Sequence, residues 1–369
     1  MTLSRLTIKT ASTLYFLIVL LLTAVVLGGA PVPMRLTDQE FRRLASDMSE
    51  PDGEFHSENL VSNEIRFQTV IPALQQRAVP GRAYVGVGSE QNFTYIAAVR
   101  PSIAFIVDIR RGNLDLHLIY KALFELSADR VQFVSRLFSR PAPPGLTAAS
   151  SAAEIFAAFM KAAPNQALYE QNLKEIKARL VTTHGLKLSA GDLEGMDFVY
   201  SSWFKGGPQI IYQLNDAGGA GLARGRGGNG GMPTYAELMT STDGTGRNQS
   251  YLAGDAAFRF IKDLQSRNLI VPIVGNFGGK KALRAVGTYL KQQGAIVSAF
   301  YVSNVEQYLR EDNIWEYFCG NAATLPIDEA SLFIRSARSG FQGAPAAGTA
   351  FSLQLDPIKP EVANCPAPH

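Results

Sequence analysis

The amino-acid sequence predicts an α/β protein in which a mostly parallel sheet carries helices on both faces. Continuous apolar runs at 102–109 (SIAFIVDI) and 269–275 (LIVPIVG) are typical of strands buried on both faces. Helix-length segments, such as 255–267 and 280–292, separate these runs. Strands that alternate with helices favour parallel pairing, so we expect a single layered core.

The first half of this core contains one strand–helix–strand unit of the usual length. Residues 82–86 form a compact apolar strand, 92–100 suit a helix, and Pro101 ends that helix before the strand at 102–109. Apolar residues then recur at helical spacing, which predicts an amphipathic helix followed by a second helix at 131–137. The spacing is carried by Leu114, Leu118, Ala122 and Leu126.

A helical and glycine-rich insertion is expected over 141–240, opened by a Pro-Ala-Pro-Pro hinge. Ser151 and Glu154 form a capping-box pattern at the start of a long helix, with a break at Pro164 and a close near Gly185. The low-complexity stretch 217–231 is typical of a flexible surface loop.

The second half returns to alternating helices and strands and completes an α/β domain over 81–340. A helical lead-in precedes it at 35–80, and a loosely ordered tail rich in Ala, Pro and Gly follows at 341–369. The expected elements are helices at 255–267, 280–292 and 306–311 and strands at 269–275, 295–302 and 330–335.

The N-terminal segment 1–34 is a signal anchor or a signal peptide. Residues 11–30 are uncharged and long enough to span a membrane, and Arg5 and Lys9 precede them. Pro31 would directly follow a cleavage site, which favours an uncleaved anchor over a cleaved signal. The protein is therefore expected to be membrane-anchored, or exported to the periplasm or cell exterior, with the main domain more easily placed outside.

Composition limits the classes of partner and site. The net charge of +3 is small for 369 residues and no block of Lys and Arg is present, so nucleic acid is not an obligatory partner. The two cysteines and four histidines lie far apart without zinc-site spacing, so no metal site is expected. We expect Cys319 and Cys365 to be free, with a disulfide as the alternative in an oxidising compartment.

A glycine loop provides the main indication of a binding site. Gly86 and Gly88 follow the first strand, and Asp108 ends the next one. In Rossmann-like units such glycines let the loop backbone approach a ligand, and the carboxylate binds ribose hydroxyls. An NAD-binding fingerprint would need glycine where Gln91 stands, which disfavours that cofactor.

The loop resembles that of class I S-adenosylmethionine-dependent methyltransferases, although Glu90 replaces the last glycine of their pattern. A closer resemblance, carried by GVGSEQNFTYIAAVRPSIAFIVDIRR and SNVEQYL, is to an uncharacterised bacterial family with a methyltransferase-like fold. The likeness to this uncharacterised family implies the fold alone. The likeness of the loop to class I methyltransferases implies that S-adenosylmethionine is the cofactor. It implies a cofactor site made of Gly86, Gly88, Glu90, Asn92, Tyr95, Asp108 and Arg110, in which Glu90 either meets the ammonium group of the cofactor or blocks binding.

Two further strand ends contribute cleft candidates, namely Asn276 with Phe277 and Ser303 with Asn304. A plain glycine turn is the favoured explanation of the first pair, and helix capping by Asn304 explains the second pair equally well. His117 is expected at the surface. These observations predict a methyltransferase of unknown acceptor, with a non-catalytic ligand-binding protein of the same fold, membrane-anchored or exported, as the alternative.

Overall fold

The computed structural model describes residues 32–55, 57–212, 232–338 and 351–367. Within them, a six-stranded sheet has the order β3-β2-β1-β4-β5-β6. Each strand pairs in parallel with its neighbour from β3 to β5, whereas β6 runs antiparallel to β5. The strands are β1 (Ala83–Gly86), β2 (Ile103–Asp108), β3 (Ile270–Val274), β4 (Val297–Ser303), β5 (Leu332–Arg338) and β6 (Phe351–Pro357).

The predicted α/β class with a mostly parallel sheet is confirmed, and the expected core strands are present with bounds shifted by up to three residues. The four strands β1 to β4 are buried almost throughout, as their continuous apolar sequences require. The chain order reverses at β1, which lies between β2 and β4. Parallel sheets of this kind leave a crevice at the carboxyl ends of the strands beside such a reversal.

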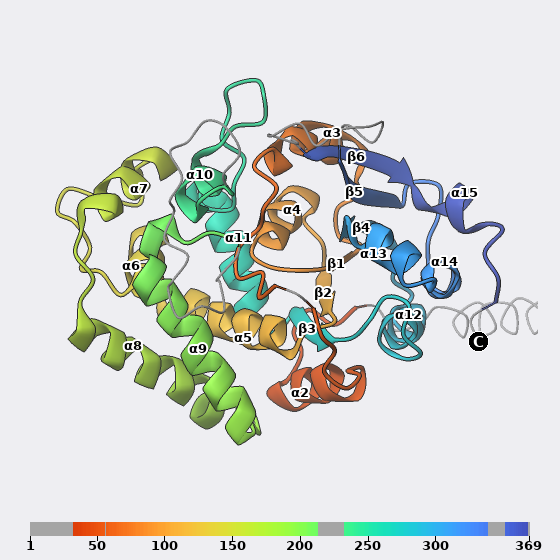
Figure 1. The fold of residues 1–369 in the computed structure, drawn as a ribbon, viewed down its shortest axis with the longest axis horizontal. Coiled ribbons are helices and arrows are strands. Elements are labelled where there is room, and N and C mark those ends of the chain that lie inside the picture. The colour runs from red at the N-terminus through yellow and green to blue at the C-terminus, as the bar shows by residue number, and fades with distance from the viewer. Residues whose placement is uncertain (1–31, 56, 213–231, 339–350, 368–369) are drawn as a thin grey trace, which may run out of the picture.

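Helices cover both faces of the sheet (Figure 1). On one face α4 contacts β1 and β4, α5 contacts β2 and β3, and α11 packs across α4 and α5. On the other face α12 contacts β2, α13 contacts β4, and both pack on α14. The bounds are α4 (Gln91–Val99), α5 (Arg111–Leu126), α11 (Asp255–Ser266), α12 (Ala282–Gln292), α13 (Val305–Glu311) and α14 (Trp315–Ala323).

The predicted insertion forms a helical block that packs against α5 on the side away from β6 (Figure 1). Ser151 and Glu154 make the reciprocal capping box expected of them, and the helix breaks around Pro164 as predicted. The insertion contains α7 (Ala152–Lys161), α8 (Gln166–Ala178), η2 (Arg179–Thr183), α9 (Ala190–Gly206), η3 (Gly207–Gln209) and α10 (Tyr235–Thr240). The preceding helix α6 (Arg130–Phe138), which was predicted at 131–137, packs with them in the same block.

A partly buried polar cluster joins this block to the lead-in helix α2 (Asp38–Asp47). The two ring nitrogens of His184 each lie 2.7 Å from a carboxylate oxygen, one of Asp38 and one of Glu125. The hydrogen bond to Glu125 is the main cause that raises the pKa of His184. Lys121, almost fully buried, donates to Glu125 at 2.7 Å and so satisfies the other oxygen of that carboxylate.

The rest of the lead-in is less helical than its sequence suggests. Only η1 (Phe67–Val70) and α3 (Ile71–Arg77) form in the stretch 62–79. Residues 57–64 instead form neither helix nor strand. The membrane-targeting prediction for residues 11–30 and the glycine-rich loop at 217–231 lie outside the described residues. Among the described helices, none is both apolar and long enough to span a bilayer.

The tail corrects two predictions. Residues 351–362, expected to be loosely ordered, form β6 and the short helix α15 (Ile358–Val362). Cys319 of α14 and Cys365, expected to be free, form a disulfide with a Cα–Cα distance of 5.4 Å. The antiparallel pairing of β5 and β6 brings the chain back towards α14, so the two thiols meet although 46 residues separate them in sequence.

Candidate functional site

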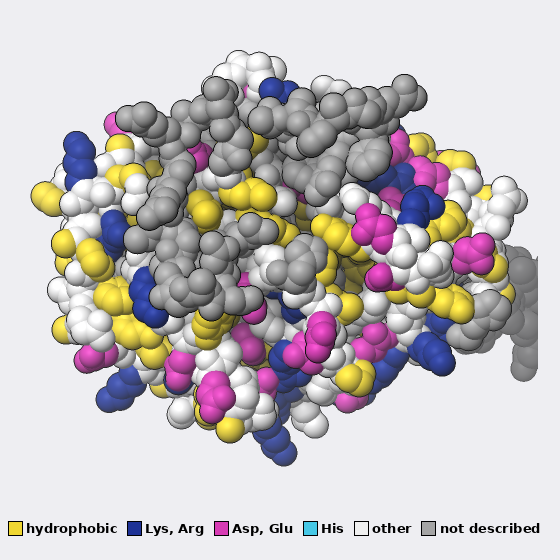
Figure 2. Space-filling model, in the orientation of Figure 1, with side chains coloured by type: hydrophobic (Ala, Val, Ile, Leu, Met, Phe, Trp, Pro, Cys, Tyr) yellow, Lys and Arg dark blue, Asp and Glu magenta, His cyan; other side chains and the backbone are white. Residues whose placement is uncertain are grey.

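A cavity of about 520 Å³ opens at the carboxyl ends of β1, β2, β3 and β4, beside the point where the strand order reverses. Residues from the segments 54–55 and 59–63 and from α13 form its other walls. Over this region, Figure 2 shows acidic side chains grouped around hydrophobic ones, close to where Figure 1 places α13. Seven of the sequence-predicted residues line the cavity: Gly88, Asp108, Arg110, Asn276, Phe277, Ser303 and Asn304.

The two glycines of the loop have different roles. Gly88 lines the cavity with a φ of +78°, and a Cβ built on it would have no heavy atom within 4 Å. Gly86 does not line the cavity. A Cβ on Gly86 would meet the amide oxygen of Asn92 and would lie 2.8 Å from the ring of Tyr84. Gly86 therefore makes room for a neighbouring side chain, whereas Gly88 supplies backbone next to open space.

Asn92 is the side chain that occupies the room left by Gly86. Its Oδ1 accepts a hydrogen bond from the Tyr84 hydroxyl at 2.9 Å. Its Nδ2 donates to the carbonyls of Val87 and Ser89, both at 2.8 Å, and to that of Gly88 at 3.3 Å. The predicted cofactor contact for Asn92 is thus wrong, because this buried amide holds the loop from behind.

His117 of α5 holds the same loop from a second direction. Its Nε2 lies 2.8 Å from the carbonyl oxygen of Gly88, so Nε2 carries the proton and donates it. The side chain is buried, contrary to the prediction of a surface histidine. Burial lowers the pKa of His117 to about 4, so the ring is neutral at physiological pH.

Asp108 and Arg110 form a buried ion pair at the cavity wall. Arg110 donates from its backbone amide and its Nε to Asp108 Oδ1, at 2.9 and 3.2 Å, and its Nη2 lies 3.3 Å from Oδ2. Arg110 also donates to the backbone carbonyl of Glu58. A ligand hydroxyl that bound Asp108 would therefore join or displace the bonds from Arg110.

Glu90 and Tyr95 do not line the cavity, contrary to their predicted place in the site. Glu90 is fully buried, and its Oε1 accepts from the Ser62 amide at 3.2 Å. Its Oε2 has no hydrogen-bond partner among the described residues, and burial raises the pKa of Glu90 to about 7. The carboxylate points into the core, so it neither contacts a ligand in this cavity nor blocks it.

A buried network at the cavity floor could not be foreseen from the glycine loop alone. Gln91 donates from Nε2 to Glu64 at 2.5 Å and to the hydroxyl of Tyr95 at 2.6 Å. Ser303 donates to the other oxygen of Glu64 at 2.8 Å, and Ser62 donates to Gln91. Burial raises the pKa of Glu64. A glutamate in the lead-in therefore ties the start of α4 to the end of β4.

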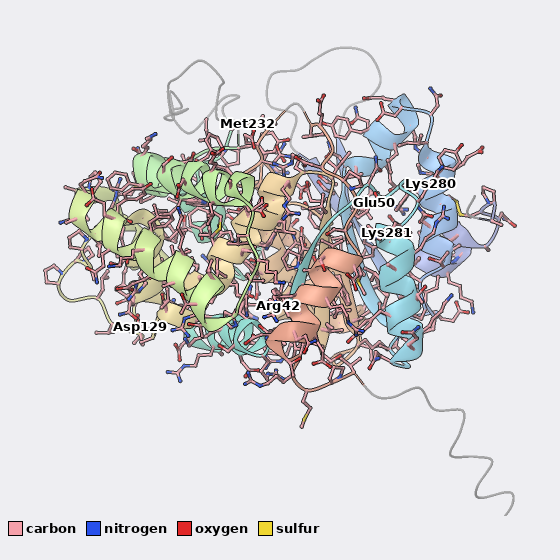
Figure 3. The ribbon with its side chains drawn as sticks, turned by 90° about the horizontal axis from the view of Figure 1, so that it is seen from below. Arg42, Glu50, Asp129, Met232, Lys280 and Lys281 are labelled. Atoms are coloured by element: carbon pink, nitrogen blue, oxygen red, sulfur yellow. A yellow bond between two sulfur atoms is a disulfide. The ribbon has the colours of Figure 1, made fainter. Side chains whose placement is uncertain are left out.

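The loop after β3 already holds an internal carboxylate. Glu50 accepts hydrogen bonds from the amides of Asn276, Lys281 and Ala282 at 3.0, 2.6 and 3.0 Å (Figure 3). The amides of Lys281 and Ala282 lie at the start of α12, where an anion would otherwise bind. Asn276 and Phe277 line the cavity, but the glycine turn that follows them is filled by Glu50.

Ser303 and Asn304 end β4 at the opposite wall. Ser303 has a φ of +52°, which turns the chain sharply into α13. The side chain of Asn304 makes no capping hydrogen bond to α13, so the capping alternative is not what the structure shows. Asn304 therefore presents its amide at the cavity wall.

Comparison with known proteins identifies a family but does not indicate an activity. No curated protein matches the chain. A family model described as a domain of unknown function (DUF7790) matches residues 59–361, which include every strand of the sheet and every cavity residue after Phe55. The match covers most of the chain, and the protein therefore belongs to the DUF7790 family.

Proposed function

We propose that the strand-end cavity binds a small molecule of nucleoside type, with S-adenosylmethionine as the first candidate, and that the protein is a methyltransferase of unknown acceptor. The observation that carries the proposal is the position of the cavity. The cavity lies where the strand order reverses, and both Gly88 and Asp108 line it. Ligands of open α/β sheets bind at this place.

The size and lining of the cavity support a ligand of this class. A volume of about 520 Å³ falls within the range of roughly 300 to 1,000 Å³ that small-molecule sites occupy. Apolar walls from Val87, Val107 and Ile109 suit a flat ring, and the amides of Asn304 and Asn63 suit its polar edge. In a methyl transfer the protein mainly aligns the two reactants. The fixed loop around Gly88 provides a rigid wall for that alignment.

Calorimetric titration of the 369-residue chain with S-adenosylmethionine tests the proposal. An Asp108→Asn variant keeps the shape of the side chain but removes its charge. We expect binding by the native chain and binding about tenfold weaker, or more, by this variant, because charge-assisted hydrogen bonds contribute about 1.5 to 3 kcal/mol.

Asp328→Asn is the matched control. Asp328 also forms a two-pronged ion pair with an arginine, Arg82, at 2.8 and 2.7 Å, but it does not line the cavity. Equal losses of affinity in both variants would show that Asp108 acts only through stability. No heat at millimolar ligand would refute the proposal.

A non-catalytic ligand-binding role is the second candidate, and the disulfide favours it. Disulfides such as Cys319–Cys365 are typical of oxidising compartments. S-adenosylmethionine is a cytoplasmic metabolite, so a domain that folds outside the cytoplasm rarely meets it. A fusion that reports the side of the C-terminus distinguishes the two: a cytoplasmic C-terminus favours the methyltransferase, and an external one favours the binding protein.

A further inference from the structure

Ser303 is placed at the cavity wall by an unusual backbone. Its φ of +52° lies in the left-handed region, which serine adopts far less readily than glycine or asparagine. The pairing of β4 with β5 is also irregular between Tyr301 and Ser303. Irregular strand ends re-aim side chains beside active sites, and left-handed backbone is concentrated at such sites. Ser303 is partly exposed and lines the cavity, whereas the other residues of β4 are buried.

The hydroxyl of Ser303 is paired with a buried acid. Its Oγ donates a hydrogen bond to Oε1 of Glu64 at 2.8 Å, and a longer contact of 3.3 Å joins it to Oδ1 of Asn304. Glu64 is only 1% exposed and does not line the cavity. Ser303 therefore has the carboxylate on one side and the cavity on the other.

The carboxylate of Glu64 is itself held in place. Its Oε2 accepts a hydrogen bond from Nε2 of Gln91 at 2.5 Å, and the hydroxyl of Ser62 donates to the amide oxygen of Gln91. The backbone amide of Glu64 donates to Oγ of Ser62 at 3.1 Å, which closes the ring of contacts. A hydroxyl within hydrogen-bond reach of a base, which a third group orients in turn, is the arrangement of an activated nucleophile.

We infer that Ser303 is a nucleophile and that the cavity accepts the acyl group of an ester or thioester whose leaving group is a weak base. The inference goes beyond the proposed function and does not rest on it, since it uses Ser303 and Glu64 rather than Gly88 and Asp108. The restriction on the leaving group follows from the position of Glu64. Because this acid lies behind Ser303, it cannot protonate a group that departs into the cavity, so the group must leave as an anion such as a thiolate or a phenolate.

The reaction has two steps. In the first, Oγ of Ser303 attacks the acyl carbon, its proton passes to Glu64, and the leaving group departs with the electron pair of its bond. Burial raises the pKa of Glu64, which helps the acid to hold this proton between the steps. In the second, water attacks the acyl carbon, the bond to Oγ breaks, and Glu64 returns the proton to Oγ. Of the two protons of the water, one stays in the carboxylic acid and the other passes to the solvent.

Oxygen of the acyl group gains negative charge in both steps. Asn304 follows Ser303 in the chain and also lines the cavity. Carboxamide nitrogens are among the donors that stabilise such an oxygen. We therefore assign this role to the side chain of Asn304.

Diisopropyl fluorophosphate is the first probe, because its fluoride leaves as an anion. Oγ of the serine forms a bond to phosphorus, the bond from phosphorus to fluorine breaks, and the serine proton passes to Glu64. We expect one label on the 369-residue chain, located at Ser303 by peptide mass spectrometry, and none when the chain is unfolded in urea. The rate of labelling should rise with pH as Glu64 loses its proton.

Variants test the role of the acid. Ser303→Ala should remove the label. Glu64→Gln keeps the shape of the side chain and should slow labelling by at least about a hundredfold, because a positioned base contributes about 100- to 10,000-fold. The rise with pH should also disappear, whereas a purely structural role of Glu64 would leave it unchanged. Glu90→Gln is the matched control, since Glu90 is also a buried acid with a raised pKa but does not line the cavity.

The second probe, para-nitrophenyl acetate, tests the acyl donor. Its phenolate leaves without a proton, and its release is followed by absorbance. We expect the native chain to accelerate this release and the Ser303→Ala variant to lose the acceleration. Label at Ser303 without such release would overturn the assignment of the acyl donor.

The remaining outcomes separate this inference from the proposed function. No label at Ser303 in the native chain, equal labelling of folded and unfolded chains, or equal rates for Glu64→Gln and Glu90→Gln would overturn the inference. Neither probe reaction involves S-adenosylmethionine. A chain that is labelled but does not bind S-adenosylmethionine would refute only the proposed function, and a chain that binds it but is not labelled would refute only the inference.

Discussion

Gly86→Ala tests how the glycine loop is held. The added methyl group would meet the Oδ1 of Asn92 and would lie 2.8 Å from the ring of Tyr84, so the amide must move. Overpacking of a buried site costs about 1 to 3 kcal/mol. Displacement of the amide also weakens its bonds to Tyr84, Val87 and Ser89. We expect the free energy of unfolding to fall by about 3 kcal/mol.

Asn92→Ala provides the second arm of a double-mutant cycle. It removes the same bonds directly and leaves the buried hydroxyl of Tyr84 without its partner, which costs about 3 to 5 kcal/mol in all. The double variant has already lost the oxygen that clashes with the new methyl group. Its loss should therefore be smaller than the sum of the single losses by about 1 to 3 kcal/mol.

Urea denaturation of the ligand-free chain measures all three variants. Gly88→Ala is the control, because it meets nothing within 4 Å and should lose only about 1 to 2 kcal/mol from its φ of +78°. Additive losses in the cycle, or a loss for Gly86→Ala no greater than that for Gly88→Ala, would refute this explanation of the loop.

Three further predictions concern stability. Glu90→Gln should stabilise the chain at pH 8, because burial raises the pKa of Glu90 from 4.5 to about 7. The cost of burying the ionised carboxylate grows between those two pH values and reaches up to about 3 kcal/mol above them. A variant no more stable than the native chain at pH 8 would contradict this prediction. His184→Gln should lower the free energy of unfolding most at low pH, because hydrogen bonds to Glu125 and Asp38 raise the pKa of His184. The stabilisation by the charged imidazolium is complete below pH 6.5 and is lost as the pH rises through the pKa of the folded state. A difference in urea midpoint that does not depend on pH would be evidence against this prediction. Reduction of Cys319–Cys365 should lower stability by about 4 kcal/mol, and the Cys365→Ser variant should be insensitive to reductant; an unchanged urea midpoint on reduction would show that the bond constrains little.

Much of the fold could be predicted because its signals are local. The apolar strands at 102–109 and 269–275 and the capping box at Ser151 depend on residues within a few positions. The edge strand β6 was missed because its alternating sequence, FSLQLDP, lies in a stretch whose composition is dominated by Ala, Pro and Gly. The disulfide was missed with it, since only that strand pairing brings Cys365 back to α14.

The sequence predicted where the site lies in the sheet better than it predicted which side chains face the cavity. Asp108, Asn276 and Ser303 end parallel strands, and such ends always share one edge of a sheet. Whether Glu90 and Asn92 turn towards the cavity or the core depends on what packs behind the loop. Glu64 was missed because its partners lie on β4 and α4, far away in the sequence. A glutamate within an otherwise unremarkable lead-in gave no local signal.

The central claim, that a nucleoside-type ligand occupies the strand-end cavity, is tested most directly by a crystal structure of the chain with S-adenosylmethionine. The account predicts ligand density between the Gly88 backbone and the Asp108 carboxylate, with Arg110 displaced or shared. Density at another place on the surface, or an empty cavity at saturating ligand, would contradict it.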